Sequence, residues 1–336
     1  MNQIRRPLDV AILEALAYSD IFDYPLSLDE LHRYLPVPAS RADLAPALAN
    51  LRGRVAERDG YYFLSNRDEI VDIRQARAAA SAKPFARAMQ IGRILGRLPF
   101  VRMVGLTGSL ATLNLSKNPD LDFMLVASRE RVWTARALSL LVGRWARLLG
   151  NTLCPNLIIS ETALEWPLRD LYSARELCQM IPVAGMDVYH RLRVANSWTS
   201  EFLPNAIEPP VIVLPEVALL EVSQTSEVWG ARLLRGKLGD RLELWEMNRK
   251  VARLSSQPGF GEETVFNAEV CQGNFHHHRK WTREAYEERL ADLGIVELNS
   301  FLIQPSLTSR HCERLLRSNP LHSQQIASSG RAPSSQ

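Results

Sequence analysis

The chain has 336 residues, of which 46% are hydrophobic and 23% are charged, and these values fit a globular protein of two or three domains. Its formal charge of only +3 permits an anionic partner but does not by itself indicate a nucleic-acid-binding protein. No run approaches the ~18–20 apolar residues of a membrane span, and no apolar signal core follows Met1, so we expect a cytoplasmic protein without a membrane partner. The four cysteines have neither metal-ligand nor redox-motif spacing, which indicates reduced thiols.

Residues 8–66 predict a small unit of three helices followed by a hairpin. Apolar residues recur at helical spacing near its start, and Ser27 with Glu30 forms the pattern of a capping box before a second helix. Ser40 precedes a third helix, and Asp59-Gly60 between two apolar runs is a strong hairpin signal. This order predicts a winged-helix-like unit. Such units contact either DNA or other proteins, and because acidic residues offset the basic ones, the sequence offers only slight support for DNA.

The next segment, residues 67–98, is rich in Ala and Arg and predicts a linking helix that is broken near Pro84. Residues 99–166 then alternate between short apolar runs and helical patterns, which predicts a central α/β domain with a short mixed sheet. Its expected strands are residues 101–107, 121–127 and 156–160, and its expected helices are residues 110–115 and 130–149.

Residues 167–300 predict a mainly helical C-terminal part, and residues 301–336 predict a disordered tail because they are rich in Ser, Arg and Gln. Helices are expected at residues 170–180, 187–195, 227–254 and 282–293. The fold class expected for the whole chain is therefore α+β.

A short pattern in the central domain carries the chemistry. Gly108-Ser109 follows the first expected strand, and after ten further residues Asp120 and Asp122 begin the second. A glycine lets the backbone approach a phosphate, and Ser109 adds a hydroxyl at an expected helix start, where free amides favour anions. Asp120 and Asp122 are two residues apart on a strand, so their carboxylates project from one face and can bind a hard cation such as Mg²⁺.

This pattern resembles that of the polymerase-β-type nucleotidyltransferase superfamily, in which a Gly-Ser pair precedes an Asp-x-Asp pair on the next strand. The resemblance covers about residues 85–165, and the chain as a whole is similar to uncharacterised bacterial proteins that join a winged-helix-like start to such a domain. It implies a transferase that moves an NMP group from an NTP to an acceptor hydroxyl, with Mg²⁺ or Mn²⁺ as the cofactor. Asp120 and Asp122 would then be the catalytic metal ligands, and Gly108, Ser109 and Lys117 would bind the nucleotide. The acceptor stays open between a small molecule, a protein and an RNA end.

The resemblance also implies a third carboxylate on a following strand, and the sequence has no clear one. Asn156 stands at the expected position, and the first acid beyond it is Glu161. An amide can bind a metal through its carbonyl oxygen, but it cannot take a proton from an attacking hydroxyl. Three alternatives follow: Glu161 or another acid substitutes, Asn156 suffices, or the domain binds nucleotide without transferring it. In the last case the protein would be a catalytically inactive nucleotide-binding or DNA-binding regulator.

A run of three histidines, His276 to His278, is the remaining metal candidate. Adjacent imidazoles on one element rarely converge on one ion, and no cysteine or further histidine lies at ligand spacing from them. A polar surface turn before the last helix is the alternative, and the sequence leaves the role of this run open.

Overall fold

A mixed six-stranded sheet lies at the centre of the computed structural model, which describes residues 6–115, 120–148, 150–166, 168–210, 234–261 and 263–295. The strand order is β7-β4-β5-β6-β9-β8; β5 and β6 are parallel, and every other neighbouring pair is antiparallel. The strands are β4 (Val101–Leu106), β5 (Asp120–Ala127), β6 (Thr152–Ser160), β7 (Ile181–Ala184), β8 (Thr264–Phe266) and β9 (Val270–Gly273). The expected α+β class with a mixed sheet is confirmed.

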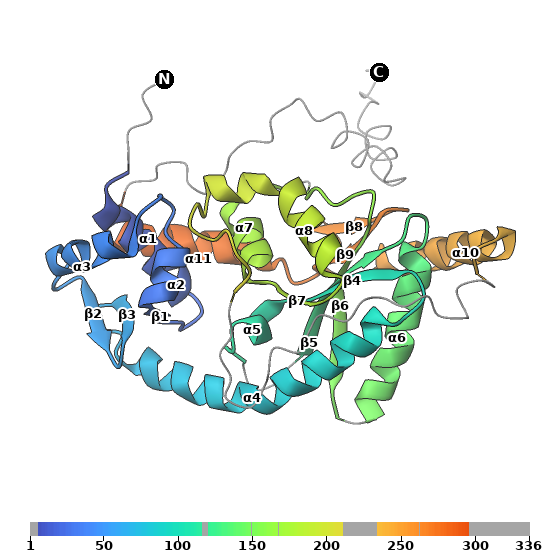
Figure 1. The fold of residues 1–336 in the computed structure, drawn as a ribbon, viewed down its shortest axis with the longest axis horizontal. Helices are drawn as coiled ribbons and strands as arrows, with labels where there is room; N and C mark the ends of the chain where they lie inside the picture. The colour runs from blue at the N-terminus through green and yellow to red at the C-terminus, as the bar shows by residue number, and fades with distance from the viewer. Residues whose placement is uncertain are drawn as a thin grey trace, which may run out of the picture.

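Helices cover both faces of this sheet (Figure 1). They are α1 (Leu8–Asp20), α2 (Leu28–Arg33), α3 (Arg41–Asn50), α4 (Glu69–Gly96), α5 (Gly108–Ala111), α6 (Val132–Leu148), α7 (Leu171–Gln179), α8 (Met186–Ala195), α10 (Lys237–Leu254) and α11 (His278–Asp292), with the 3₁₀ turn η1 (Ser197–Glu201). Met103 and Met124 pack with α7 and α8 on one face, whereas Val104 and Phe123 pack with α4 and α6 on the other. Because strand side chains alternate, each central strand contributes to both cores.

The three helices and the hairpin predicted for residues 8–66 are present. The hairpin strands β2 (Val55–Arg58) and β3 (Tyr61–Leu64) turn at Asp59-Gly60, where both residues have positive φ. A third short strand, β1 (Leu26–Ser27), pairs with β3. The buried side chains of α1 to α3 belong to the same continuous core as those of α7, α8 and α11, so this N-terminal unit is packed against the rest of the chain.

The helix that follows differs from expectation, because α4 runs unbroken through Pro84. A proline inside a helix removes one backbone hydrogen bond and bends the helix, at a cost of about 3 kcal/mol. Packing compensates here, since Phe85, Ala88 and Leu95 on one side of α4 are buried against the sheet. In Figure 1, α4 forms one long curved helix that joins the N-terminal unit to the central sheet.

The C-terminal half contains strands as well as the expected helices, and these strands extend both edges of the sheet. β7 pairs with β4, and β9 pairs with β6. β7 is the fully buried run Ile-Pro-Val-Ala, and a proline is tolerated in it because the strand lies at an edge. No described helix combines the length and the apolar character needed to cross a membrane. The tail predicted beyond residue 300 and the first turns of the helix predicted at 227–254 lie outside the described residues.

Candidate active site

Gly108 and Asp122 are in direct contact at the end of β4. The backbone N–H of Thr107 donates to the carbonyl oxygen of Asp122 over 2.9 Å, which aligns the turn after β4 with the start of β5. Gly108 has φ +67°, and a Cβ atom at this position would lie 2.5 Å from Oδ2 of Asp122. Only glycine therefore fits, both for its backbone conformation and for the space that the carboxylate occupies.

The two aspartates begin β5 and project from the same face of the strand, with Asp120 exposed and Asp122 partly buried. The pKa of Asp122 is raised to about 7, mainly by burial; a hydrogen bond from Asn156 lowers it, and the charge of Asp120 raises it. No described lysine or arginine forms an ion pair with either aspartate. Two neighbouring carboxylates that form no ion pair within the described chain fit a bound cation.

Asn156 lies beside Asp122 because of an irregularity in β6. Asp122 pairs with Cys154 and Phe123 with Pro155, but Met124 pairs with Leu157, so Asn156 is an unpaired extra residue. Its side chain donates a hydrogen bond to Asp122 and accepts one from the thiol of Cys154 over 2.9 Å. The bulge thus brings Asn156 to the carboxylates, where a third acid was expected.

The Cys154 thiol is held in its neutral form at this site. Its pKa is raised to about 12, mainly by burial and also by the charges of Asp122 and Asp120, against a lowering by Arg136. A neutral thiol can donate to Asn156, and it is a poor nucleophile at neutral pH. We therefore assign Cys154 to the support of Asn156.

Glu176 on α7 is a further acid near Asp122 that the sequence pattern does not predict. Burial raises its pKa to about 7, and the charge of Asp122 adds to this rise. Met180, just beyond α7, packs closely on Gly105 of β4. A Cβ atom added to Gly105 would lie 2.4 Å from the sulfur of Met180. α7 therefore covers the same sheet face from which Asp122 projects. No signal in the sequence distinguishes Glu176, because its approach to Asp122 depends on how α7 packs on the sheet.

Comparisons of the chain with models of known families, with curated proteins and with solved structures found no match. The site is therefore interpreted from its own geometry and from the pattern of its residues.

Glu161, the other acid considered for the third position, lies elsewhere. Because β5 and β6 are parallel, Ala127 pairs with Ser160 at the far end of the two strands, and the Glu161 N–H donates to Ala127. Roughly 17 Å of strand separates Asn156 from Glu161. The Glu161 carboxylate forms ion pairs with Arg102 and Arg191, at 4.0 and 3.8 Å, so it does not share the site of Asp122.

The remaining predicted residues have mixed outcomes. Ser109 is exposed beside Gly108, but the helix expected after it is a single turn, so an anion there would gain little from a helix dipole. Lys117 lies outside the described residues. The rings of His276 and His278 are 5.8 Å apart at the start of α11. Within the described ranges, no three or more His, Cys, Asp or Glu side chains form a group that could hold a metal ion.

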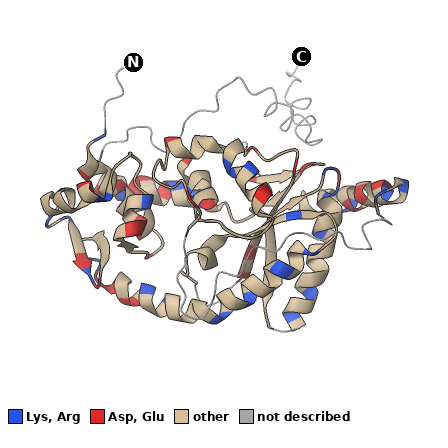
Figure 2. Cartoon of the chain, viewed as in Figure 1, with Lys and Arg blue, Asp and Glu red and all other residues tan. Residues whose placement is uncertain are grey.

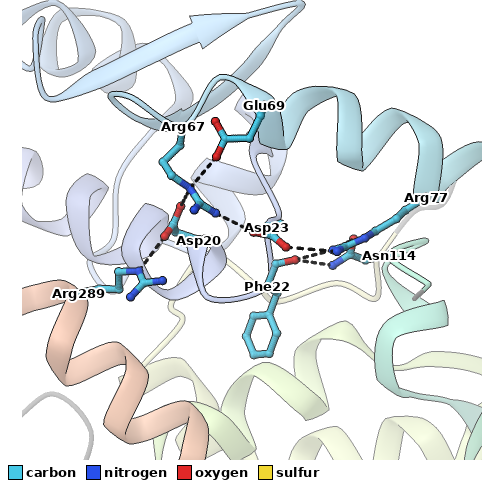
Figure 3. Close-up of polar contacts among 8 residues, drawn as sticks. All are labelled: Asp20, Phe22, Asp23, Arg67, Glu69, Arg77, Asn114 and Arg289. Carbon is cyan, nitrogen blue, oxygen red and sulfur yellow. Dashed lines mark hydrogen bonds and ion pairs between the residues drawn. The ribbon is translucent and has the colours of Figure 1, made fainter. Parts of the chain in front are cut away.

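The loop between Ser109 and Asp120 is bound by the N-terminal unit and by α4. Figure 3 shows Asn114 beside Arg77, with both side chains directed at the carbonyl oxygen of Phe22; Asn114 accepts from Arg77 over 3.2 Å and donates to Phe22 over 3.0 Å. The Tyr24 hydroxyl donates to the Thr112 carbonyl oxygen over 3.1 Å. These contacts make the N-terminal unit part of the framework that positions the Gly-Ser turn.

Proposed function

We propose that the chain is a metal-dependent nucleotidyltransferase that moves an NMP group from an NTP to an acceptor hydroxyl. The observation that carries the proposal is the contact of Gly108 with Asp122, next to Asp120 and without an ion pair to either aspartate within the described chain. A glycine turn for phosphates and two aspartates on the adjacent strand are the parts that this reaction requires, and they match the pattern found in the sequence.

Asp120 and Asp122 would hold Mg²⁺ or Mn²⁺. Mg²⁺ is usually bound in proteins by one or two carboxylates together with substrate phosphates, so two aspartates suffice. When bound, the metal would neutralise charge on the transferring phosphoryl group. Asn156 orients the Asp122 carboxylate through its hydrogen bond, and the Ser109 hydroxyl would donate to a phosphate oxygen of the nucleotide. Lys117 stays a prediction as a further phosphate ligand.

In the reaction the acceptor oxygen forms a bond to the α-phosphorus, the bond to pyrophosphate breaks, and the acceptor proton must move to a base. Glu176 would take this proton, because it is the described carboxylate near Asp122 that is left when two aspartates bind the metal. Replacement of Glu176 by Gln should lower kcat and leave the KM for NTP nearly unchanged. If the KM for NTP instead rises as much as kcat falls, Glu176 would be assigned to nucleotide binding.

The activity is tested with the full chain, each labelled NTP, and Mg²⁺ or Mn²⁺, by following pyrophosphate release and transfer of the label. Asp120→Asn and Asp122→Asn should each abolish both signals while circular dichroism stays unchanged. Glu161→Gln is the matched control, because this acid lies at the other end of β6, and it should keep full activity. Wild-type protein that binds neither metal nor NTP would defeat the proposal.

A catalytically inactive nucleotide-binding regulator is the second candidate, and the amide at Asn156 is the observation that favours it. Regulation through DNA has less support, because the exposed surface of α3 carries Ala42, Ala45, Pro46 and Ala49. The only arginine on α3 forms an ion pair with Asp29 over 2.9 Å. A winged-helix role in protein contact fits such a neutral helix surface better than a role in phosphate contact.

A further inference from the structure

Positive charge is strongly segregated along the chain. Residues 73–119 contain eight lysines and arginines and no acidic residue, and residues 131–160 contain four arginines and no acidic residue. The whole chain nevertheless has a formal charge of only +3. Arg74, Arg77, Arg102 and Arg131 of these segments form ion pairs with acids elsewhere in the chain. The two segments include most of α4 and all of α6, which carry most of the remaining cations.

α4 and α6 contact each other and pack against the same face of the sheet. Their exposed cations are Lys83 and Arg87 on α4, Arg97 directly after its last residue, and Arg144 and Arg147 on α6, and we call these five residues the basic face. None of these five side chains forms an ion pair with a described residue, whereas exposed arginines elsewhere, such as Arg129, do so. In Figure 2, α6 and the later turns of α4 carry Lys and Arg and no Asp or Glu.

An aromatic side chain accompanies these charges on α6. Trp145 is 49% exposed and stands in the sequence between Arg144 and Arg147. Exposed tryptophans next to arginines are a common means of binding single-stranded nucleic acid, because the cations neutralise phosphates while the ring stacks on a base. Along α4 the cations extend from Lys83 to Arg97 just after its end, roughly 21 Å along the helix axis, which is long enough for several nucleotides.

The basic face ends next to the carboxylate site. α6 ends at Leu148, and β6 begins at Thr152, whose partner in the sheet is Asp120. On α4, the buried Ser81 hydroxyl accepts from the backbone N–H of Leu115, so this turn of α4 lies against the loop between Ser109 and Asp120, while Lys83 is exposed on the other side of the helix. α4 and α6 cover the sheet face opposite to the one from which Asp122 projects, so a strand bound along α6 would reach the aspartates around the strand ends at Thr152 and Asp120.

We propose that the basic face binds single-stranded nucleic acid and that this strand provides the acceptor hydroxyl. The second part rests on the proposed transferase function, whereas the first part does not. A membrane surface fits less well, because no large hydrophobic side chain is exposed on the described residues of α4. Lipid contact would then be confined to Leu141, Trp145 and Leu148 at the end of α6.

Binding is tested by fluorescence anisotropy with the full chain and labelled RNA or DNA single strands of about 20 nucleotides. The double charge reversal Arg144→Glu with Arg147→Glu should weaken binding at least about tenfold. It should also reduce the slope of log affinity against log salt concentration by the amount expected for about two lost phosphate contacts. The matched control is Lys237→Glu with Arg241→Glu on α10, which changes the charge equally and should bind as the wild type does. Trp145→Ala should weaken binding about five- to tenfold, and Trp245→Ala, a residue 58% exposed on α10, should not.

Three results would overturn the proposal: absence of binding at low salt, an equal loss in the α10 control, or binding to phosphatidylserine vesicles without binding to either nucleic acid. Preference for a duplex over the single strand would overturn the single-stranded form. A comparison of the affinities for RNA and DNA strands shows whether the protein prefers ribose or deoxyribose. Asp122→Asn separates the two proposals, because it should lose transfer and keep binding. If the wild type binds the strand but transfers no NMP group to it, the acceptor role of the strand is refuted. If the wild type transfers an NMP group to other hydroxyls and does not bind the strand, only the transferase function remains.

Discussion

Arg77 and Asn114 connect the N-terminal unit to the Gly108-Ser109 turn, since the arginine of α4 donates to the Asn114 side chain over 3.2 Å in the loop between Ser109 and Asp120. The same guanidinium also binds Phe22 and Asp23 of the N-terminal unit, at 2.9 and 3.2 Å. We expect Arg77→Ala to weaken NTP binding by up to about tenfold, because a hydrogen bond of this kind contributes about 0.5–1.5 kcal/mol. Isothermal titration with a non-hydrolysable NTP measures the change.

Arg67 provides the control for this prediction. It lies in the same network (Figure 3) and pairs with Asp20, Asp23 and Glu69, but these ion pairs do not reach the described part of the loop. Arg67→Ala should therefore lower the melting temperature about as much as Arg77→Ala does and leave the affinity for NTP unchanged. Equal loss of affinity in both variants would mean that the N-terminal unit acts through general stability.

Gly108→Ala should remove the site while keeping most of the fold. The new methyl group would lie 2.5 Å from Oδ2 of Asp122, and alanine at φ +67° adds backbone strain. We expect a loss of about 1–3 kcal/mol in the free energy of unfolding, together with loss of Mn²⁺ binding measured by calorimetry. Gly60→Ala is the matched control, since Gly60 has φ +78° but nothing within 4 Å of an added Cβ. It should show the strain without the loss of metal binding.

The stability of the metal-free protein should fall as the pH rises. The pKa of Asp122 is raised from 3.8 to about 7, and that of Glu176 from 4.5 to about 7. Because the folded state holds these protons more tightly, their contribution is fully present below about pH 4 and is lost as the pH rises through about 7. Asp122→Asn should therefore raise the free energy of unfolding at pH 8 by about 1–2 kcal/mol and flatten the pH profile. Chemical denaturation from pH 4 to 8 checks this, and a profile that rises instead would contradict it.

Asn156→Asp tests whether the bulge in β6 is a metal position. The new carboxylate would replace an amide that donates to Asp122, so repulsion should destabilise the metal-free protein by about 1–2 kcal/mol at pH 8. If Asn156 stands at the third ligand position, Mn²⁺ affinity should rise about tenfold and activity should persist. Unchanged Mn²⁺ affinity with lower stability would show instead that Asn156 only positions Asp122, which favours the regulator.

Local signals in the sequence determined much of this protein. Strand and helix periodicity located β4, β5 and α6, and turn chemistry located the hairpin at Asp59-Gly60, because these features depend on neighbouring residues. The spacing from Gly108 to Asp122 likewise identified the pair that the fold brings into contact.

Only the tertiary structure decided the rest of the site. The four apolar residues of β7 could not be distinguished from part of a helix, and they form a strand because β4 offers them an unpaired edge. Glu176 approaches Asp122 only because α7 packs on the same sheet face, and the bulge that brings Asn156 to the aspartates exists only in the pairing of β5 with β6. Contacts between residues far apart in the chain depend on packing and strand register, and these are properties of the assembled sheet.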